Sequence, residues 1–178
     1  MSADGHHVPS LERRVAQLRS AFDNAFALPL APPQPDGVEL LIVRAGGQTY
    51  AMRTSELAGV EVDRRLVPLP ATAPELLGLC AAQGELVPVF ELAAVLGGQA
   101  AKTSPRWIAL HRDKELVALA FEELLESRRV AARDLSPIEL APGRGALSRH
   151  AIRLETGVIH VLDIPAVISS LRHSQQRR

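Results

Sequence analysis

The residues of this chain that could carry out chemistry are few and stand far apart. Its single cysteine, Cys80, lies between Leu79 and Ala81 in an apolar run, where burial would raise the pKa of the thiol and make it a poor nucleophile. Ser148-Arg149-His150 puts a hydroxyl near an imidazole, but a catalytic serine needs a base that the fold brings to it and a strained turn that exposes it. The six histidines show no spacing typical of zinc ligands: His6, His7, His111, His150, His160 and His173. We therefore predict no catalytic, metal-binding or cofactor-binding residue.

Motifs for phosphate binding and for acid–base catalysis are not found either. The paired glycines do not follow a strand and open a long helix, as a phosphate loop must: Gly46-Gly47, Gly97-Gly98 and Gly143-Arg144-Gly145. Glu122 and Glu123 are adjacent, so their carboxylates face opposite sides of a strand or lie on a solvated turn. Because no set of residues meets the geometric requirements of an active site, we expect a binding module and not an enzyme.

The composition is that of a globular chain. Its 178 residues are 47% hydrophobic and 22% charged, which suffices for the core of one domain or of two small barrels joined together. Lys plus Arg and Asp plus Glu both total 20, so no long-range field gathers nucleic acid. The lone cysteine fits a reducing compartment, and the N-terminus does not resemble a secretory signal. Since every apolar run is far shorter than the ~20 residues of a membrane span, we expect a cytoplasmic protein without membrane insertion.

Three segments recur in degraded form further along the chain. The matching pairs are Tyr50-Ala51-Met52 with Val117-Ala118-Leu119, Glu56-Leu57 with Glu123-Leu124, and Val89-Phe90-Glu91-Leu92 with Val161-Leu162-Asp163-Ile164. The first two pairs share the offset 117 − 50 = 67, and the third has the offset 161 − 89 = 72. Because the offsets are similar and the order is kept, the chain is expected to contain two related halves. A duplicated small β unit is more typical of a binding module than of an enzyme.

The N-terminal residues are predicted to stand apart from the β-rich body. Residues 1–9 are small and polar, as in a disordered tail. Ser10 can cap an amphipathic helix over residues 10–27, whose apolar stripe recurs at steps of three and four: Leu11, Val15, Leu18, Phe22 and either Ala25 or Phe26. Four prolines make residues 28–37 a stiff, extended linker.

Short strands with a two-residue apolar alternation make up residues 38–171. We expect strands at 40–44, 49–52, 60–62, 76–81 and 85–90 in the half 38–100, with a turn or short helix at 55–59 and a helical turn at 92–96. We expect strands at 107–111, 116–120, 128–132, 150–154 and 158–162 in the half 101–171, with a segment at 121–125 equivalent to 55–59 and a closing helix at 165–171. Residues 172–178 are expected to be a polar tail. This pattern predicts a mainly β fold of small antiparallel barrels.

Further residues have predicted structural roles. Glu91 and Asp163 each follow a strand and precede a helical segment, so each is expected to cap that helix. Tyr50 and Trp107 are expected to pack in the core. Gly84 and Gly157 are expected at hairpin positions with positive φ.

The order of these segments resembles a CheW-like domain over residues 38–171. The motifs that carry the resemblance are Gly46-Gly47-Gln48-Thr49-Tyr50, the segment Pro70 to Pro74, Gly78, Gly84, Val87-Pro88-Val89, Glu91-Leu92 and Val161-Leu162-Asp163-Ile164. The resemblance implies two intertwined five-stranded SH3-like barrels without an active site. It also implies an adaptor in bacterial chemosensory signal transduction, which joins the cytoplasmic tip of a methyl-accepting receptor to the regulatory domain of a histidine autokinase.

The chain departs from the family pattern at two positions. The family usually has Asn-Leu-Arg-Gly where this chain has Ala81-Ala82-Gln83-Gly84, so a neutral amide replaces a guanidinium. The family often has a glutamate where this chain has Gly59. Both changes favour an alternative function, an interaction module for other scaffold proteins in a polarity or motility complex.

The expected contact residues follow from the same motifs. They lie in the loop after the second strand and in the hairpin from Gly78 to Gly84: Leu57, Gly59, Val60, Ala81, Gln83 and Gly84. A groove lined by such small and apolar side chains could receive the apolar face of a helical receptor tip.

Overall fold

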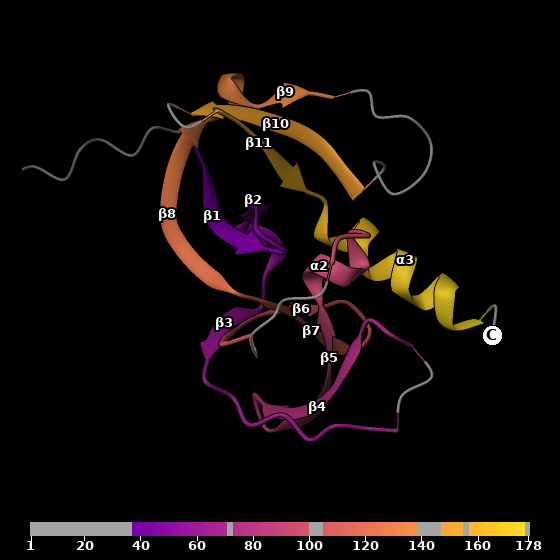
Figure 1. The fold of residues 1–178 in the computed structure, drawn as a ribbon. Coiled ribbons are helices and arrows are strands. Elements are labelled where there is room, and N and C mark those ends of the chain that lie inside the picture. Colours follow the sequence, from indigo (N-terminus) through magenta and orange to yellow (C-terminus); the bar gives the residue numbers. More distant parts are fainter. Residues whose placement is uncertain (1–36, 71–72, 100–104, 139–146, 155–156, 177–178) are drawn as a thin grey trace, which may run out of the picture. The chain divides into compact units, whose positions relative to one another are not determined.

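Two β-sheets account for most of the chain that the structure describes. The structure is a computed structural model, and it describes residues 37–70, 73–99, 105–138, 147–154 and 157–176. The predicted tail 1–9, the amphipathic helix 10–27 and the linker as far as residue 36 lie outside the described residues. The prediction of a mainly β fold is confirmed (Figure 1).

Each sheet contains five longer strands, and the first also has a two-residue strand. The order in the first sheet is β8 (Glu123–Ala131), β1 (Gly37–Ala45), β2 (Gln48–Arg53), β11 (Gly157–Leu162), β10 (Ser148–Leu154) and β9 (Ser136–Pro137). The order in the second sheet is β3 (Gly59–Val62), β6 (Trp107–Arg112), β7 (Leu116–Phe121), β5 (Glu85–Glu91) and β4 (Leu76–Ala82). The described helical segments are η1 (Thr54–Glu56), α2 (Leu92–Val95), η2 (Ala132–Asp134) and α3 (Ile164–Gln176).

The two halves of the sequence exchange their first hairpins. The β1–β2 hairpin of the first half pairs with β8 and β11 of the second half, and the β6–β7 hairpin of the second half pairs with β3 and β5 of the first. The halves 38–100 and 101–171 therefore do not each form one sheet. The two halves are joined by parallel pairs of strands, β5 with β7 and β11 with β2. Parallel neighbours cannot be connected by a tight hairpin, so each pair brings together strands that are distant in the sequence.

The strand registers reproduce the two sequence offsets. Val89 lies opposite Ala118 in the second sheet, and Val161 lies opposite Ala51 in the first. The differences between equivalent positions, 161 − 89 = 72 and 118 − 51 = 67, are the offsets of the sequence matches. The repeat is thus visible in the hydrogen-bonded pairing of the strands.

Three apolar cores follow from the alternation of side chains along the strands. One core lies within the first sheet and includes Leu40 and Ile42, while a second lies within the second sheet and includes Cys80 and Val87. The third and largest, which we call the central core, contains Leu41 and other residues of both sheets together with residues of α2 and α3. Figure 1 shows these two helices beside the place where the sheets meet. Strands β1 and β7 are consequently buried on both faces.

The predicted aromatic and hairpin positions agree with this arrangement. Tyr50 and Trp107 pack against the central core and are partly buried. Gln83 and Gly84 form the β4–β5 turn with φ of 50° and 81°, and Gly157 has a φ of 126°. Two positive φ angles in succession suit the right-handed twist of the flanking strands, and Gly84 adopts its angle without strain.

Helix capping was predicted correctly at one of two sites. The backbone N–H of Ala166 donates to Asp163 Oδ1 at 2.9 Å, so Asp163 caps α3. Glu91 occupies the cap position of α2, but its side chain makes no capping hydrogen bond. Gly97, with a φ of 83°, follows the end of α2. Neither α2 nor α3, the helices of the described residues, is long and apolar enough to cross a membrane.

β8 and α3 are among the elements that are longer than the sequence pattern predicts. Residues 121–125 were expected to resemble the turn at 55–59, but Glu123 begins the strand β8, which pairs with β1 along its length. Helix α3 was expected to end at residue 171, but it continues through Arg172 to Gln176. For β8 the pairing with β1 extends the strand beyond its apolar pattern.

Because the two sheets share the central core, a core substitution in one sheet should also lower the stability of the other. Met52 and Leu119 occupy equivalent positions of the repeat, and each is fully buried in the central core. Met52→Ala and Leu119→Ala are each expected to lower the free energy of unfolding by about 2–5 kcal/mol. Urea unfolding should be followed by far-UV circular dichroism and by the fluorescence of Trp107, which belongs to the second sheet. A Met52→Ala variant whose fluorescence transition stayed at the wild-type midpoint would show that the sheets unfold independently.

Candidate partner-binding surface

Closure of the second sheet brings the predicted contact residues together. Strands β3 and β4 are the two edges of this sheet. The side chain of Gln83, in the β4–β5 turn, donates from Nε2 to the carbonyl oxygen of Ala58 at 3.1 Å, immediately before β3. A Cβ placed on Gly59 would lie 3.4 Å from the same Nε2 atom. The turn and the loop after β2 therefore form one continuous surface.

The six predicted residues differ in how far they reach solvent. Ala81, Gln83 and Gly84 are exposed, whereas Gly59 is partly buried. Leu57 and Val60 are also partly buried, and both pack against the central core. These two side chains are therefore committed largely to the fold, and the exposed part of the surface is the hairpin.

A charged side chain that the sequence did not single out lies at the same turn. Arg112, at the end of β6, donates from Nη1 to Glu85 Oε1 at 3.1 Å and from Nη2 to Gln83 Oε1 at 3.4 Å. The Arg112 and Glu85 side chains are both substantially exposed, so this ion pair adds little stability. Its effect is to hold a guanidinium group beside the neutral amide of Gln83.

The outer face of the hairpin is apolar, and we call it the hairpin face: Leu79, Ala81, Leu86 and Pro88. Ala81 lies directly opposite Leu86, and Leu79 lies opposite Pro88, so the four side chains form two adjacent rows on one side of the sheet. Leu86 is 74% exposed, an unusual state for a large apolar side chain in a strand.

The segment before β4 widens the hairpin face. Val67, which is 56% exposed, pairs with Leu79 through two backbone hydrogen bonds. This approach requires glycine at position 78, because a Cβ there would lie 2.2 Å from the carbonyl oxygen of Val67. The prolines of this segment remove backbone donors, which suits a segment that lies along a sheet edge.

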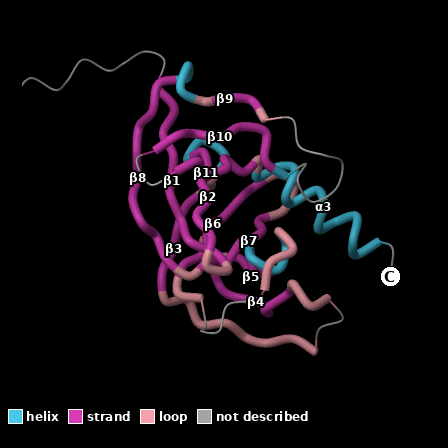
Figure 2. The backbone as a smooth tube through the Cα atoms, turned by 45° about the horizontal axis from the view of Figure 1, so that its top comes forward, coloured by secondary structure: helices cyan, strands magenta, loops and turns pink. Residues whose placement is uncertain are grey.

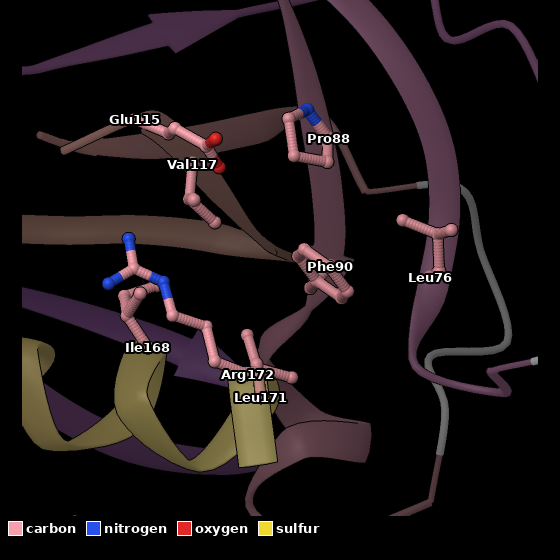
Figure 3. A pocket seen from close by; sticks show the side chains of 8 residues that line it. All are labelled: Leu76, Pro88, Phe90, Glu115, Val117, Ile168, Leu171 and Arg172. Carbon is pink, nitrogen blue, oxygen red and sulfur yellow. The ribbon is translucent and has the colours of Figure 1, made fainter. Parts of the chain in front are cut away.

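A pocket of about 150 Å³ continues the hairpin face toward α3 (Figure 3). Pro88 belongs to both, and Phe90 follows it on the same side of β5. The residues that line this α3 pocket are Leu76, Pro88, Phe90, Glu115, Val117, Ile168, Leu171 and Arg172. Its apolar lining and small volume suit one apolar side chain of a partner better than a whole small-molecule ligand.

An ion pair places a charge at the rim of the α3 pocket. Arg172 donates from Nη1 to Asp113 Oδ2 at 3.0 Å and so ties α3 to the turn between β6 and β7. This hydrogen bond holds the pKa of Asp113 below its ordinary value. The pair therefore keeps its charges at neutral pH.

In the described part of the chain, the side chains of Cys80, His111 and His150, which could take part in catalysis, are buried or already hydrogen-bonded. Burial raises the pKa of the Cys80 thiol, and the nearby Glu61 carboxylate raises it further, so Cys80 is a poor nucleophile as predicted. His111 donates from Nδ1 to the carbonyl oxygen of Glu56, and Arg53 donates to His150 Nδ1 at 2.9 Å. Among the described residues, no group of three or more His, Cys, Asp or Glu is arranged to hold a metal ion.

Sequence reasoning missed Leu86, Pro88, Arg112 and the contribution of α3. One signal was available: residues 86–90 are apolar at every position, so both faces of that strand require an apolar neighbour. The inner face, with Val87, packs in the barrel, while the outer face is covered by α3 only in part. Arg112 could not be found, because only the pairing of β6 with β7 brings it to the hairpin.

Two interlocked small β-barrels, one of which carries an exposed apolar face, define the fold class of this chain. Residues 39–172 match the family model of the CheW-like domain, and the chain belongs to this family. Its fold is similar to the crystal structure of the scaffolding protein TtCheW from Thermoanaerobacter tengcongensis, with a TM-score of 0.62 and 15% sequence identity. That similarity covers 71% of this chain and 88% of TtCheW. A comparison with curated proteins finds no match.

Introducing a charge at Val60 should lower the stability of the fold, and not only weaken the binding of a partner. Val60 packs against the central core, so Val60→Glu is expected to lower the free energy of unfolding by about 1–3 kcal/mol. Val62→Glu is the matched control, because Val62 lies on the same strand and is 42% exposed. Thermal and urea unfolding of both variants measure the difference. Equal stability of Val60→Glu and the wild type would place Val60 in the binding surface.

The Asp113–Arg172 pair should contribute to stability only while Asp113 is ionised. Because the pKa of Asp113 is lower in the folded chain than in the unfolded chain, the contribution is present above the unfolded pKa and is lost as the pH falls through the folded pKa. Asp113→Asn is therefore expected to destabilise the protein slightly at about pH 7, and to have a smaller effect when the pH is lowered toward about pH 3. Urea unfolding at both pH values measures this, with Asp134→Asn as the control for loss of one negative charge. A pH-independent effect would mean that the pair does not hold α3.

Proposed function

We propose that this chain is a non-enzymatic adaptor of bacterial chemosensory signalling, which couples the cytoplasmic tip of a methyl-accepting receptor to a histidine autokinase. Membership of the CheW-like family over residues 39–172 supports this proposal, as does the likeness of its fold to a scaffolding protein. The observation that carries it is the exposed apolar surface formed by the hairpin face and the α3 pocket. Such a surface binds proteins and needs no catalytic group.

An exposed apolar surface of this kind suits the apolar face of an amphipathic helix. A receptor tip is a helical hairpin, and its apolar side chains could lie over Leu86 and Ala81 while one of them enters the α3 pocket. Arg112 and Arg172 lie at the edges of the apolar area, where each could meet an acidic residue of the partner. Apolar contacts in the middle and charges at the rim are the usual arrangement of specific protein interfaces.

The kinase would bind through a different part of the same module. The regulatory domain of the histidine kinase resembles the CheW-like fold, so a barrel-to-barrel contact is the natural mode of association. In this scheme the protein acts in the cytoplasm, binds no nucleic acid and needs no cofactor.

A second function is favoured by one observation at the hairpin turn. Gln83 uses its amide to close the second sheet on Ala58, so the turn itself bears no charge. If a partner required a guanidinium at this position, the chain would serve a polarity or motility complex with other scaffold proteins instead. Arg112 weakens this alternative, because its guanidinium lies beside Gln83.

Replacement of Leu86 by aspartate tests the proposed surface. Leu86 is 74% exposed, so Leu86→Asp should leave the fold intact while it removes the apolar centre of the interface. Affinity for a purified receptor-tip fragment, measured by calorimetry, is expected to fall at least about tenfold. Val158→Asp is the matched control, because Val158 is 57% exposed on a strand of the other sheet.

Cross-linked pull-downs from native cells then distinguish the two functions. Recovery of a receptor and a histidine kinase by the wild type, with loss of the receptor in Leu86→Asp but not in Val158→Asp, supports the adaptor. Consistent recovery of other scaffold proteins without either component contradicts it and favours the alternative.

A further inference from the structure

The chain passes from the first sheet to the second through η1, and Glu56 lies at this crossing. Its carboxylate accepts hydrogen bonds from two different elements: Arg53 Nη1 of β2 donates to Oε1 at 3.1 Å, and the backbone N–H of Ile164 in α3 donates to Oε2 at 3.0 Å. Its carbonyl oxygen accepts a third hydrogen bond from His111 Nδ1 of β6 at 2.6 Å. One residue thus contacts both sheets and the first turn of α3.

The bond to Ile164 completes the capping of α3. The first N–H groups of a helix have no partner within the helix. Asp163 supplies acceptors for Ala166 and Val167, and Pro165 has no N–H to satisfy. Glu56 accepts the remaining one, and its negative charge near the positive end of the helix dipole strengthens the contact. The position of the start of α3 therefore depends on the position of η1.

From Glu56 the chain leads directly into the candidate surface. Two residues later, Ala58 donates its N–H to the carbonyl oxygen of Leu110 at 2.7 Å and accepts the side-chain hydrogen bond of Gln83 from the hairpin turn. In the other direction, Ile168 and Leu171 of α3 line the α3 pocket, one and two turns beyond Ile164. Two hydrogen bonds, Gln83 to Ala58 and Ile164 to Glu56, together with the backbone from Glu56 to Ala58 and the first two turns of α3, thus connect the hairpin turn with the pocket.

We propose that Glu56 is a positioning residue that couples the hairpin turn to the α3 pocket. A partner side chain that displaces α3 at the pocket would shift Ile164, and through Glu56 the loop that holds Gln83. Conversely, a partner that moves the hairpin turn would act on the start of α3. The coupling is a property of this chain by itself and does not depend on the identity of the partner proposed above.

The repeat supplies a built-in comparison. Glu123 is equivalent to Glu56 at the shorter offset of the repeat (123 − 56 = 67), but it pairs with Arg44 at 3.5 Å on the surface, and its side chain is 54% exposed. The Glu56 side chain is 19% exposed. Loss of the carboxylate at position 123 should therefore have a local effect only.

Hydrogen exchange of the backbone amides, measured by mass spectrometry on the full chain, tests the coupling. Glu56→Ala is expected to speed exchange at least about tenfold in two separated regions, the start of α3 and residues 57–60 with the hairpin turn. Glu56→Gln keeps an acceptor for Ile164 and should restore most of the protection of α3. Glu123→Ala should leave both regions unchanged.

A second variant tests the same coupling at the hairpin turn. Gln83→Ala removes the hydrogen bond to Ala58 at the surface and is not expected to unfold the protein, because Gln83 is exposed. Faster exchange at residues 57–60 and also at Ile164 and Ala166 would support the coupling, even if Glu56→Ala failed to fold. Faster exchange confined to residues 57–60, with α3 unchanged in every variant, would overturn it.

Discussion

The central core, which the two sheets share, is the interaction on which the rest of this structure depends. Leu41 and Met52 contribute to it from the first sheet, and Leu119 and Phe121 contribute from the second. Because each half of the chain lends its hairpin to the other half's sheet, neither sheet can form without residues from both halves. Strands β1 and β7 are therefore buried on both faces, since each has the central core on one side and the separate apolar core of its own sheet on the other.

The candidate binding surface is the part of this arrangement that the helices leave uncovered. Phe90 and Val117 lie under α3, whereas Leu86, on the same side of β5 as Phe90, is open to solvent. Figure 2 shows α3 running away from the strands at its C-terminal end, so that the helix covers the second sheet only in part. The same apolar face of β5 therefore stabilises the fold at one end and is available to a partner at the other.

The polar contacts around this surface hold its parts in place and do not perform chemistry. Gln83 closes the barrel edge, Arg172 ties α3 to the β6–β7 turn, and Glu56 joins η1 to the start of α3. Each of these side chains is at least partly open to solvent, so each contributes more to geometry than to stability. A protein that transmits binding from one partner to another requires such defined connections between surfaces, since coupling between sites needs a physical route.

The sequence by itself determined most of the strands and turns, the repeat and the cap of α3, because these depend on local alternation and on side chains near in sequence. Asp163 lies three residues from the amide that it caps, and Gln83-Gly84 lies between the two strands that it joins. Which half pairs with which was decided only by the tertiary structure, since parallel pairing such as that of β5 with β7 leaves no local signal. The same holds for Val60, which alternation alone could not assign to the core or to solvent, and for Arg112 and Glu56, whose partners lie far away in the sequence.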